Sequence, residues 1–79
     1  MYDNIYLYMR IIFLKSTTVD LVNWDIDDSI YEKTFYKNTI LEAIKVNKDS
    51  NNFSSIELPD GKMIVEIRND CFKIVDDET

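Results

Sequence analysis

The stretch that decides the fold is residues 54–75, SSIELPDGKMIVEIRNDCFKIV, in which three short apolar runs are separated by two turn signals. The first turn is Pro-Asp-Gly at 59–61 and holds the only proline and the only glycine of the chain. Proline pre-sets the φ of a turn and glycine accepts a positive φ, so this tripeptide predicts a hairpin loop. Asn69 and Asp70, which tolerate positive φ, predict a second turn. The stretch therefore predicts a three-stranded antiparallel meander.

The spacing of the apolar residues sets the expected register of this meander. A four-residue loop at 59–62 places Leu58 opposite Met63, and it sorts apolar from polar side chains better than a three-residue loop with a bulge. A two-residue turn at 69–70 then places Ile67 opposite Phe72. The expected core face consists of Ile56, Leu58, Met63, Val65, Ile67, Phe72 and Ile74. The opposite face carries Glu57, Ile64, Glu66 and Arg68.

Upstream, residues 2–15 alternate as a strand that is apolar on both faces, which is typical of a central strand. One face of this strand is expected to carry Ile5, Leu7, Met9, Ile11 and Phe13. The other is expected to carry Tyr6, Tyr8, Arg10, Ile12 and Leu14. A turn at Ser16 and Thr17 then predicts that residues 18–26 return as a second strand beside the first.

A helix is expected between the first two strands and the meander. Ser29 and Glu32 stand at the spacing of a capping box, and acidic residues around them suit a helix N-terminus. The segment 34–36 is β-prone, so the helix is predicted over 38–47 and its start near residue 29 stays open. The stripe expected to pack on the sheet consists of Lys33, Tyr36, Ile40, Ala43 and Ile44. The predicted fold class is α+β: an antiparallel sheet of four to five strands with one helix on a face.

Length and composition point to one small domain, residues 1–79, with a frayed tail at 76–79. A core of this size gives only about 3–5 kcal/mol of net stability. The single cysteine, Cys71, excludes an internal disulfide. No apolar run approaches the ~20 residues of a membrane span, so a cytoplasmic protein without a membrane partner is predicted. The net charge of −6 favours a basic partner and disfavours nucleic acid.

An acidic cluster is the first candidate site, formed by Asp25, Asp27, Asp28 and Glu32. Carboxylates at this spacing could bind Mg²⁺ or Ca²⁺, but the cluster lacks the glycine and the ordered ligand spacing of a calcium loop. We therefore predict no metal and no cofactor, and interpret the cluster as charge that contacts a basic partner.

Aromatic residues on the first strand are the second candidate. Tyr6 and Tyr8 alternate with Arg10 on its less aliphatic face, and tyrosine and arginine concentrate at protein interfaces. Tyrosines on a strand also suit base stacking with single-stranded nucleic acid. We predict that these three residues contact a partner or a second subunit.

Catalytic residues are not predicted anywhere in the chain. Cys71 falls between polar neighbours on the expected outer face, and no histidine exists to act as its base. A single glycine also excludes a glycine-rich phosphate loop. The expectation is a protein that is not an enzyme.

Three segments carry a resemblance to a known class of proteins: the strand MRIIFLKS, the helix ending ILEAIKVNK and the closing SIELPDGKMIVEIRNDCFKIV. In this outline and in its Asn/Asp/Lys/Ile/Tyr-rich composition the chain resembles small accessory proteins of phages and mobile elements of low-GC Gram-positive bacteria. The resemblance implies an anti-defence-type inhibitor in the host cytosol that binds and inhibits or modulates a host protein by occupying its surface. The alternatives are a self-associating structural or regulatory module and a single-stranded nucleic-acid binder that uses strand tyrosines.

Overall fold

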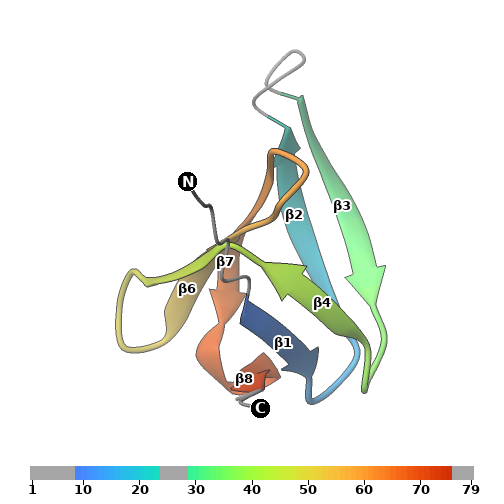
Figure 1. The fold of residues 1–79 in the computed structure, drawn as a ribbon, viewed down its shortest axis with the longest axis vertical. Helices are drawn as coiled ribbons and strands as arrows, with labels where there is room; N and C mark the ends of the chain where they lie inside the picture. The colour runs from blue at the N-terminus through green and yellow to red at the C-terminus, as the bar shows by residue number, and fades with distance from the viewer. Residues whose placement is uncertain (1–8, 24–28, 76–79) are drawn as a thin grey trace, which may run out of the picture.

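The computed structural model describes residues 9–23 and 29–75, and these form eight β-strands and one 3-10 turn (Figure 1). The strands are β1 (Met9–Phe13), β2 (Thr17–Asn23), β3 (Ser29–Phe35), β4 (Ile40–Ala43), β5 (Lys45–Lys48), β6 (Phe53–Glu57), β7 (Lys62–Arg68) and β8 (Phe72–Val75). The 3-10 turn η1 (Asn69–Cys71) joins the last two strands. Every paired strand in this part of the chain is antiparallel to its neighbour.

The strands form two sheets, one of three strands in the order β4-β1-β8 and one of five in the order β3-β2-β7-β6-β5. The chain passes from one sheet to the other four times: between β1 and β2, between β3 and β4, at Ile44, which alone separates β4 from β5, and at η1. Strands that switch sheets at such bends form the corners of an orthogonal packing. The core between the sheets consists of Ile11, Phe13, Val19, Leu21, Phe35, Ala43, Ile56, Ile64, Ile67, Cys71 and Phe72.

The predicted helix over 38–47 is wrong, and with it the α+β fold class, because the described residues form eight strands, one 3-10 turn and no α-helix. The residues of that helix form β4, which pairs with β1, and β5, which pairs with β6. In β4 burial alternates with a period of two: Leu41 and Ala43 are turned inward while Ile40 and Glu42 are exposed. The helix start near residue 29, which the sequence left open, does not form, since Ser29 and Glu32 both lie in β3. Sheet pairing over this β-branched and aromatic segment overrides the local helix signals.

The first predicted strand is confirmed in its inward alternation, since Ile11 and Phe13 are buried while Leu14 is exposed. Its central position is also confirmed, because β1 lies between β4 and β8. The hairpin with the next strand is wrong: β1 and β2 belong to different sheets. Residues 2–8 and 24–26 of these two predicted strands lie outside the described residues.

The hairpin at the Pro-Asp-Gly turn is confirmed, but its expected register is wrong. The Leu58 amide donates to the Lys62 carbonyl at 2.9 Å, so the loop holds the three residues 59–61, and Gly61 has φ 90°. This shorter loop places Ile56 opposite Ile64, and Ile64 is fully buried although it was assigned to the outer face. Val65, predicted as core, is only half-buried. The three-residue loop that sequence patterning disfavoured is the one that forms.

A bulge explains why the remaining core residues of this hairpin still face inward. The pairing of β6 with β7 shifts between Ser54 and Ile56, and Glu66 has φ 54°. The extra residue in β7 returns the following side chains to the core face. Ile64 and Ile67 are therefore both buried although they are three positions apart. Patterning alone cannot show such a bulge, because it assumes a strict period of two.

The second predicted turn, at 69–70, does not make a hairpin. Asn69–Cys71 form η1, and β8 leaves the large sheet to pair with β1, with Phe72 opposite Phe13. The predicted three-stranded meander therefore ends after two strands. Phe72 is buried as expected, whereas Ile74 is 46% exposed. Cys71 is buried rather than on the outer face.

Replacing Glu66 by Gly is expected to raise the free energy of unfolding by about 0.5–1 kcal/mol, because glycine removes the strain of a positive φ. Glu42→Gly is the matched control, since Glu42 is an exposed strand residue without a positive φ. This control should instead lose about 0.5–1 kcal/mol. Urea unfolding measures the free energy of unfolding of both variants. A loss of stability in both would show that the positive φ of Glu66 does not destabilise the fold.

Candidate functional site

Most of the predicted partner-binding residues lie outside the described residues, namely Tyr6, Tyr8, Asp25, Asp27 and Asp28. The two that are described are exposed and stand in different sheets, Arg10 in β1 and Glu32 in β3. The structure therefore does not join these two residues on one sheet.

The negative charge of the chain is unevenly distributed. All nine basic residues are described, whereas only eight of the fifteen acidic residues are. The other seven acidic residues lie in 1–8, 24–28 and 76–79. The two-sheet body is thus close to charge balance, and its recognition properties depend on where individual charges lie.

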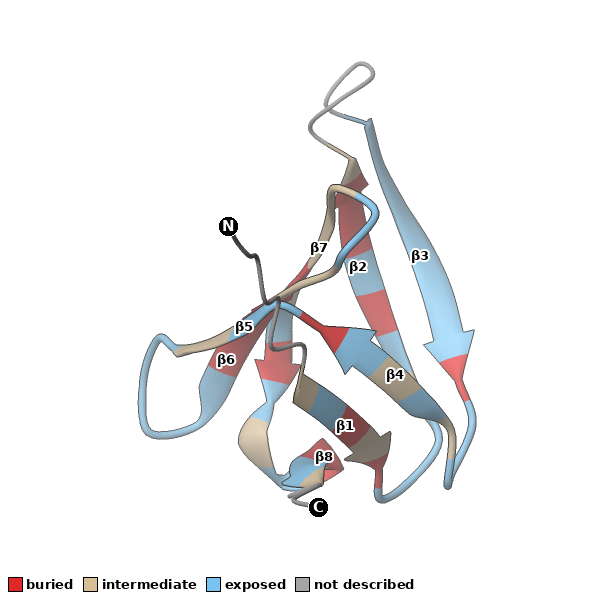
Figure 2. Cartoon of the chain, viewed as in Figure 1, coloured by how far each residue is buried: buried red, intermediate tan, exposed pale blue. Residues whose placement is uncertain are grey.

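Strand β3 is the most exposed element of the described body (Figure 2). It pairs with β2 along its full length, and its other edge pairs with no strand within residues 9–23 and 29–75. Six of its seven residues are exposed, with Ile30 at 65% and Tyr31 at 40%. The strand contains neither proline nor a bulge. Its backbone is therefore open to pairing with another strand.

The two faces of β3 differ in character. Tyr31 stands opposite the buried Leu21, so Tyr31, Lys33 and Phe35 point to the core side. The outward side carries Ile30, Glu32 and Thr34. A 2.7 Å hydrogen bond between the hydroxyls of Thr18 and Thr34 confirms that opposite residues share a face.

A groove of about 230 Å³ lies on the core side of β3. It is lined by Leu21, Tyr31, Lys33, Phe35, Leu41, Leu58, Asp60 and Lys62. Leu41 belongs to β4 of the small sheet, so the groove lies between an edge strand of each sheet. Figure 1 shows β3 and β4 diverging from the turn that joins them. We call this feature the β3 groove; its floor is apolar and its rim is charged.

Two lysines give the rim of the β3 groove a positive character. The Lys62 ammonium lies 3.7 Å from the Asp60 carboxylate and 5.9 Å from the centre of the Tyr31 ring. Hydrogen bonding with Tyr31 is the main reason that the pKa of Lys62 is raised, with Asp60 adding to it. Lys33 lies 5.6 Å from the centre of the Phe35 ring and makes no ion pair among the described residues.

The outward face of β3 has the opposite charge. Glu32 stands directly across from Asp20 on β2, and like charges in this position repel. Neither carboxylate has a cationic partner in the described part of the chain. A basic group placed beside them would relieve this repulsion.

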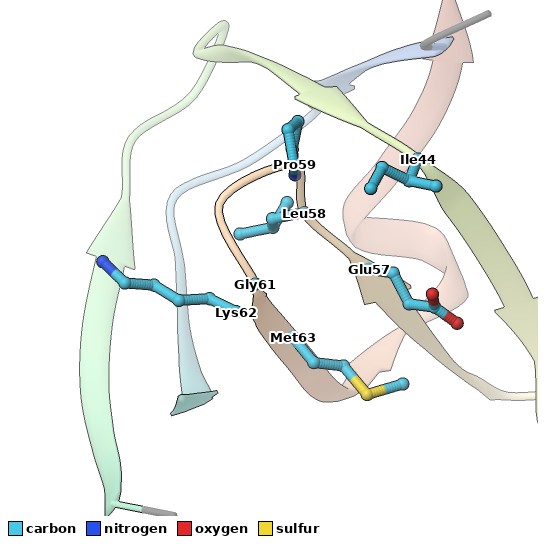
Figure 3. A pocket seen from close by; sticks show the side chains of 7 residues that line it. All are labelled: Ile44, Glu57, Leu58, Pro59, Gly61, Lys62 and Met63. Carbon is cyan, nitrogen blue, oxygen red and sulfur yellow. The ribbon is translucent and has the colours of Figure 1, made fainter. Parts of the chain in front are cut away.

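A second cleft, of about 350 Å³, lies at the 59–61 loop (Figure 3). It is lined by Ile44, Glu57, Leu58, Pro59, Gly61, Lys62 and Met63. Lys62 reaches away from Glu57 in this view. We call this feature the Glu57 cleft. Sequence reasoning missed both features, since it placed Lys33 and Ile44 on a helix and Glu57 in a different register.

The described residues contain neither a candidate metal site nor a candidate membrane-spanning helix. No group of three or more His, Cys, Asp or Glu side chains there is arranged to hold a metal ion. No helix within residues 9–23 and 29–75 has the length and apolar character needed to cross a membrane.

Comparisons with protein-family models, curated proteins and solved structures find no match to this chain.

Proposed function

We propose that this chain is a binding protein that adds an extended segment of a partner protein to the free edge of β3. The observation that supports this function is an exposed seven-residue edge strand beside an apolar groove. Soluble proteins usually protect such edges with charged side chains, proline, bulges or covering elements, because an open edge recruits other strands. Strand β3 carries Glu32 and Lys33, but no proline, bulge or covering strand among the described residues, and its exposed Ile30 and Tyr31 suit partner binding.

The chemistry of the two faces defines the partner segment. Side chains of an added strand alternate between the faces of the sheet. Those that enter the β3 groove meet Tyr31 and Lys33, which suit apolar and acidic residues respectively. Those on the outward face meet Glu32 beside Asp20, which suits a basic residue. The partner segment thus alternates apolar or acidic residues with basic ones.

The resemblance to phage and mobile-element accessory proteins suggests the wider role of this binding. In that role the partner is a host protein in the cytosol, and the chain inhibits or modulates it by occupying the segment. The proposed interface includes Glu32, which the sequence also predicts as a partner-binding residue and which lies in β3. No covalent chemistry is required, because backbone pairing supplies affinity and the alternate side chains supply specificity.

A photo-cross-linking experiment tests the proposal. Benzoylphenylalanine replaces Tyr31 in one version of the protein and Phe53 in the other, an aromatic residue of similar exposure at 38% on the distant strand β6. We expect a cross-linked partner from position 31 alone. We also expect Lys33→Glu to weaken binding of that partner at least about tenfold in a biosensor assay, while Lys73→Glu does not.

Two results would overturn the proposal. Equal cross-linking from both positions would show that β3 is not the interface. A dimer in light scattering that Lys33→Glu dissociates would identify a second copy of the chain as the occupant.

A further inference from the structure

We infer that the Glu57 cleft binds a cationic side chain, the ammonium of a lysine or the guanidinium of an arginine, through the carboxylate of Glu57. The cleft shares Leu58 and Lys62 with the β3 groove but contains no residue of β3, so this site does not depend on the proposed function. Figure 3 shows Glu57 and Met63 pointing to one side of the 59–61 loop, while Lys62 extends to the other.

The walls of the cleft suit the aliphatic stem of such a side chain. Ile44 is 46% exposed at the corner between the sheets, Pro59 is exposed, and Leu58 and Met63 are half-buried. Lysine and arginine pack their methylene stems along apolar surfaces of this kind and keep the charged group at a polar site. The volume of about 350 Å³ leaves room for one long side chain.

The carboxylate is held in position by the strands around it. Asn47 donates from its side-chain Nδ2 to Glu57 Oε2 at 3.2 Å. The Ile44 amide donates to the backbone carbonyl of Glu57 at 2.8 Å, which ties the apolar wall to the strand that carries the acid. One hydrogen bond leaves a carboxylate with free acceptor positions, so Glu57 can accept further bonds from a cation.

No cation among the described residues forms an ion pair with Glu57. Lys62 lines the cleft with its stem, but its ammonium pairs with Asp60 and contacts Tyr31. Lys45 stands across from Glu57 on β5 and forms no ion pair with it in the described structure. A half-buried, unpaired carboxylate beside apolar walls favours an incoming cation more than an open-surface carboxylate does.

Two small probes test this inference by ¹H–¹⁵N NMR titration of the full chain. N-acetyl-lysine methylamide carries the ammonium, and N-acetyl-norleucine methylamide has the same stem without the charge. The lysine probe is expected to shift the Ile44, Gly61 and Met63 amides saturably, with a Kd of about 1–20 mM, and to bind at least about fivefold more tightly than the norleucine probe.

Glu57→Gln is expected to weaken the lysine probe about fivefold and to leave the norleucine probe unchanged. The variant keeps an amide oxygen that can accept from Asn47, and its spectrum reports whether the fold is intact. Glu66→Gln, an exposed acid that does not line the cleft, serves as the matched control and should bind like the original protein. Equal affinity for the two probes in the original protein, or unchanged binding in Glu57→Gln, would overturn the site.

Discussion

Replacing Ile64 by Asp is expected to leave the domain unfolded at room temperature. Ile64 is fully buried between Ile56 on β6 and Leu21 on β2, at the centre of the large sheet. An aspartate there loses the packing of a buried isoleucine and places a charge where no partner exists, at a cost of more than about 4 kcal/mol. A domain of this size has only about 3–5 kcal/mol of net stability, so the loss is sufficient to unfold it. Far-UV circular dichroism and urea unfolding measure the effect.

The neighbouring substitution Val65→Asp is the control for this experiment. Val65 is half-buried on the outer face and stands opposite Asp20, so the new charge meets a like charge but stays near water. Its cost is expected to be about 1–2 kcal/mol, which leaves the fold detectable. A larger loss for Val65→Asp than for Ile64→Asp would favour the four-residue loop and contradict the register described above.

Replacing Phe35 by Ala is expected to lower the free energy of unfolding by about 3–5 kcal/mol. The Phe35 ring stacks on that of Phe13 with centroids 4.8 Å apart and planes 13° apart. Phe13 lies in the small sheet and Phe35 in the large one, so this pair joins the two sheets. Phe35 is also the only buried residue of β3, so its loss should detach the strand that carries the proposed interface.

Tyr36→Ala provides the comparison, because Tyr36 is the next residue and is 68% exposed. Its truncation should change stability by less than about 0.5 kcal/mol. Thermal unfolding compares the two variants, and amide hydrogen exchange reports whether β3 loses protection first in Phe35→Ala. If both truncations cost the same, the stack does not hold the sheets together.

Several local features were correctly predicted from the sequence because each depends on neighbouring residues alone. The only proline and glycine fall in the loop at 59–61, where their backbone preferences apply directly. The alternation in β1 placed Ile11 and Phe13 inward, as the structure has them. Ile56 and Ile67 were also placed correctly, the latter because the bulge compensates the error in loop length.

The helix was predicted wrongly because the spacing of apolar residues in this segment fits a helix and two short strands equally well. Residues 40, 43 and 44 recur at helical spacing, yet the same positions also fit two short strands that bend at Ile44. Partners far away in the chain decide between the two, since β4 pairs with β1 and β5 with β6. The sequence gives a clearer indication of strand structure at 29–35, where isoleucine, tyrosine, threonine and phenylalanine favour a strand over a helix.

The sequence by itself determined the turn at 59–61, the strand character of residues 9–13 and the net charge of −6, because these follow from local backbone preference, local periodicity and composition. Only the tertiary structure decided which strands share a sheet, and therefore that the outer edge of β3 pairs with no described strand and that Glu57 lines a cleft with apolar walls. The sheet order depends on pairs such as β1 with β8 and β2 with β7, whose residues lie far apart in the sequence. Pairing between strands stabilises the fold only when the whole sheet forms. No single segment therefore specifies the order of strands in the sheet.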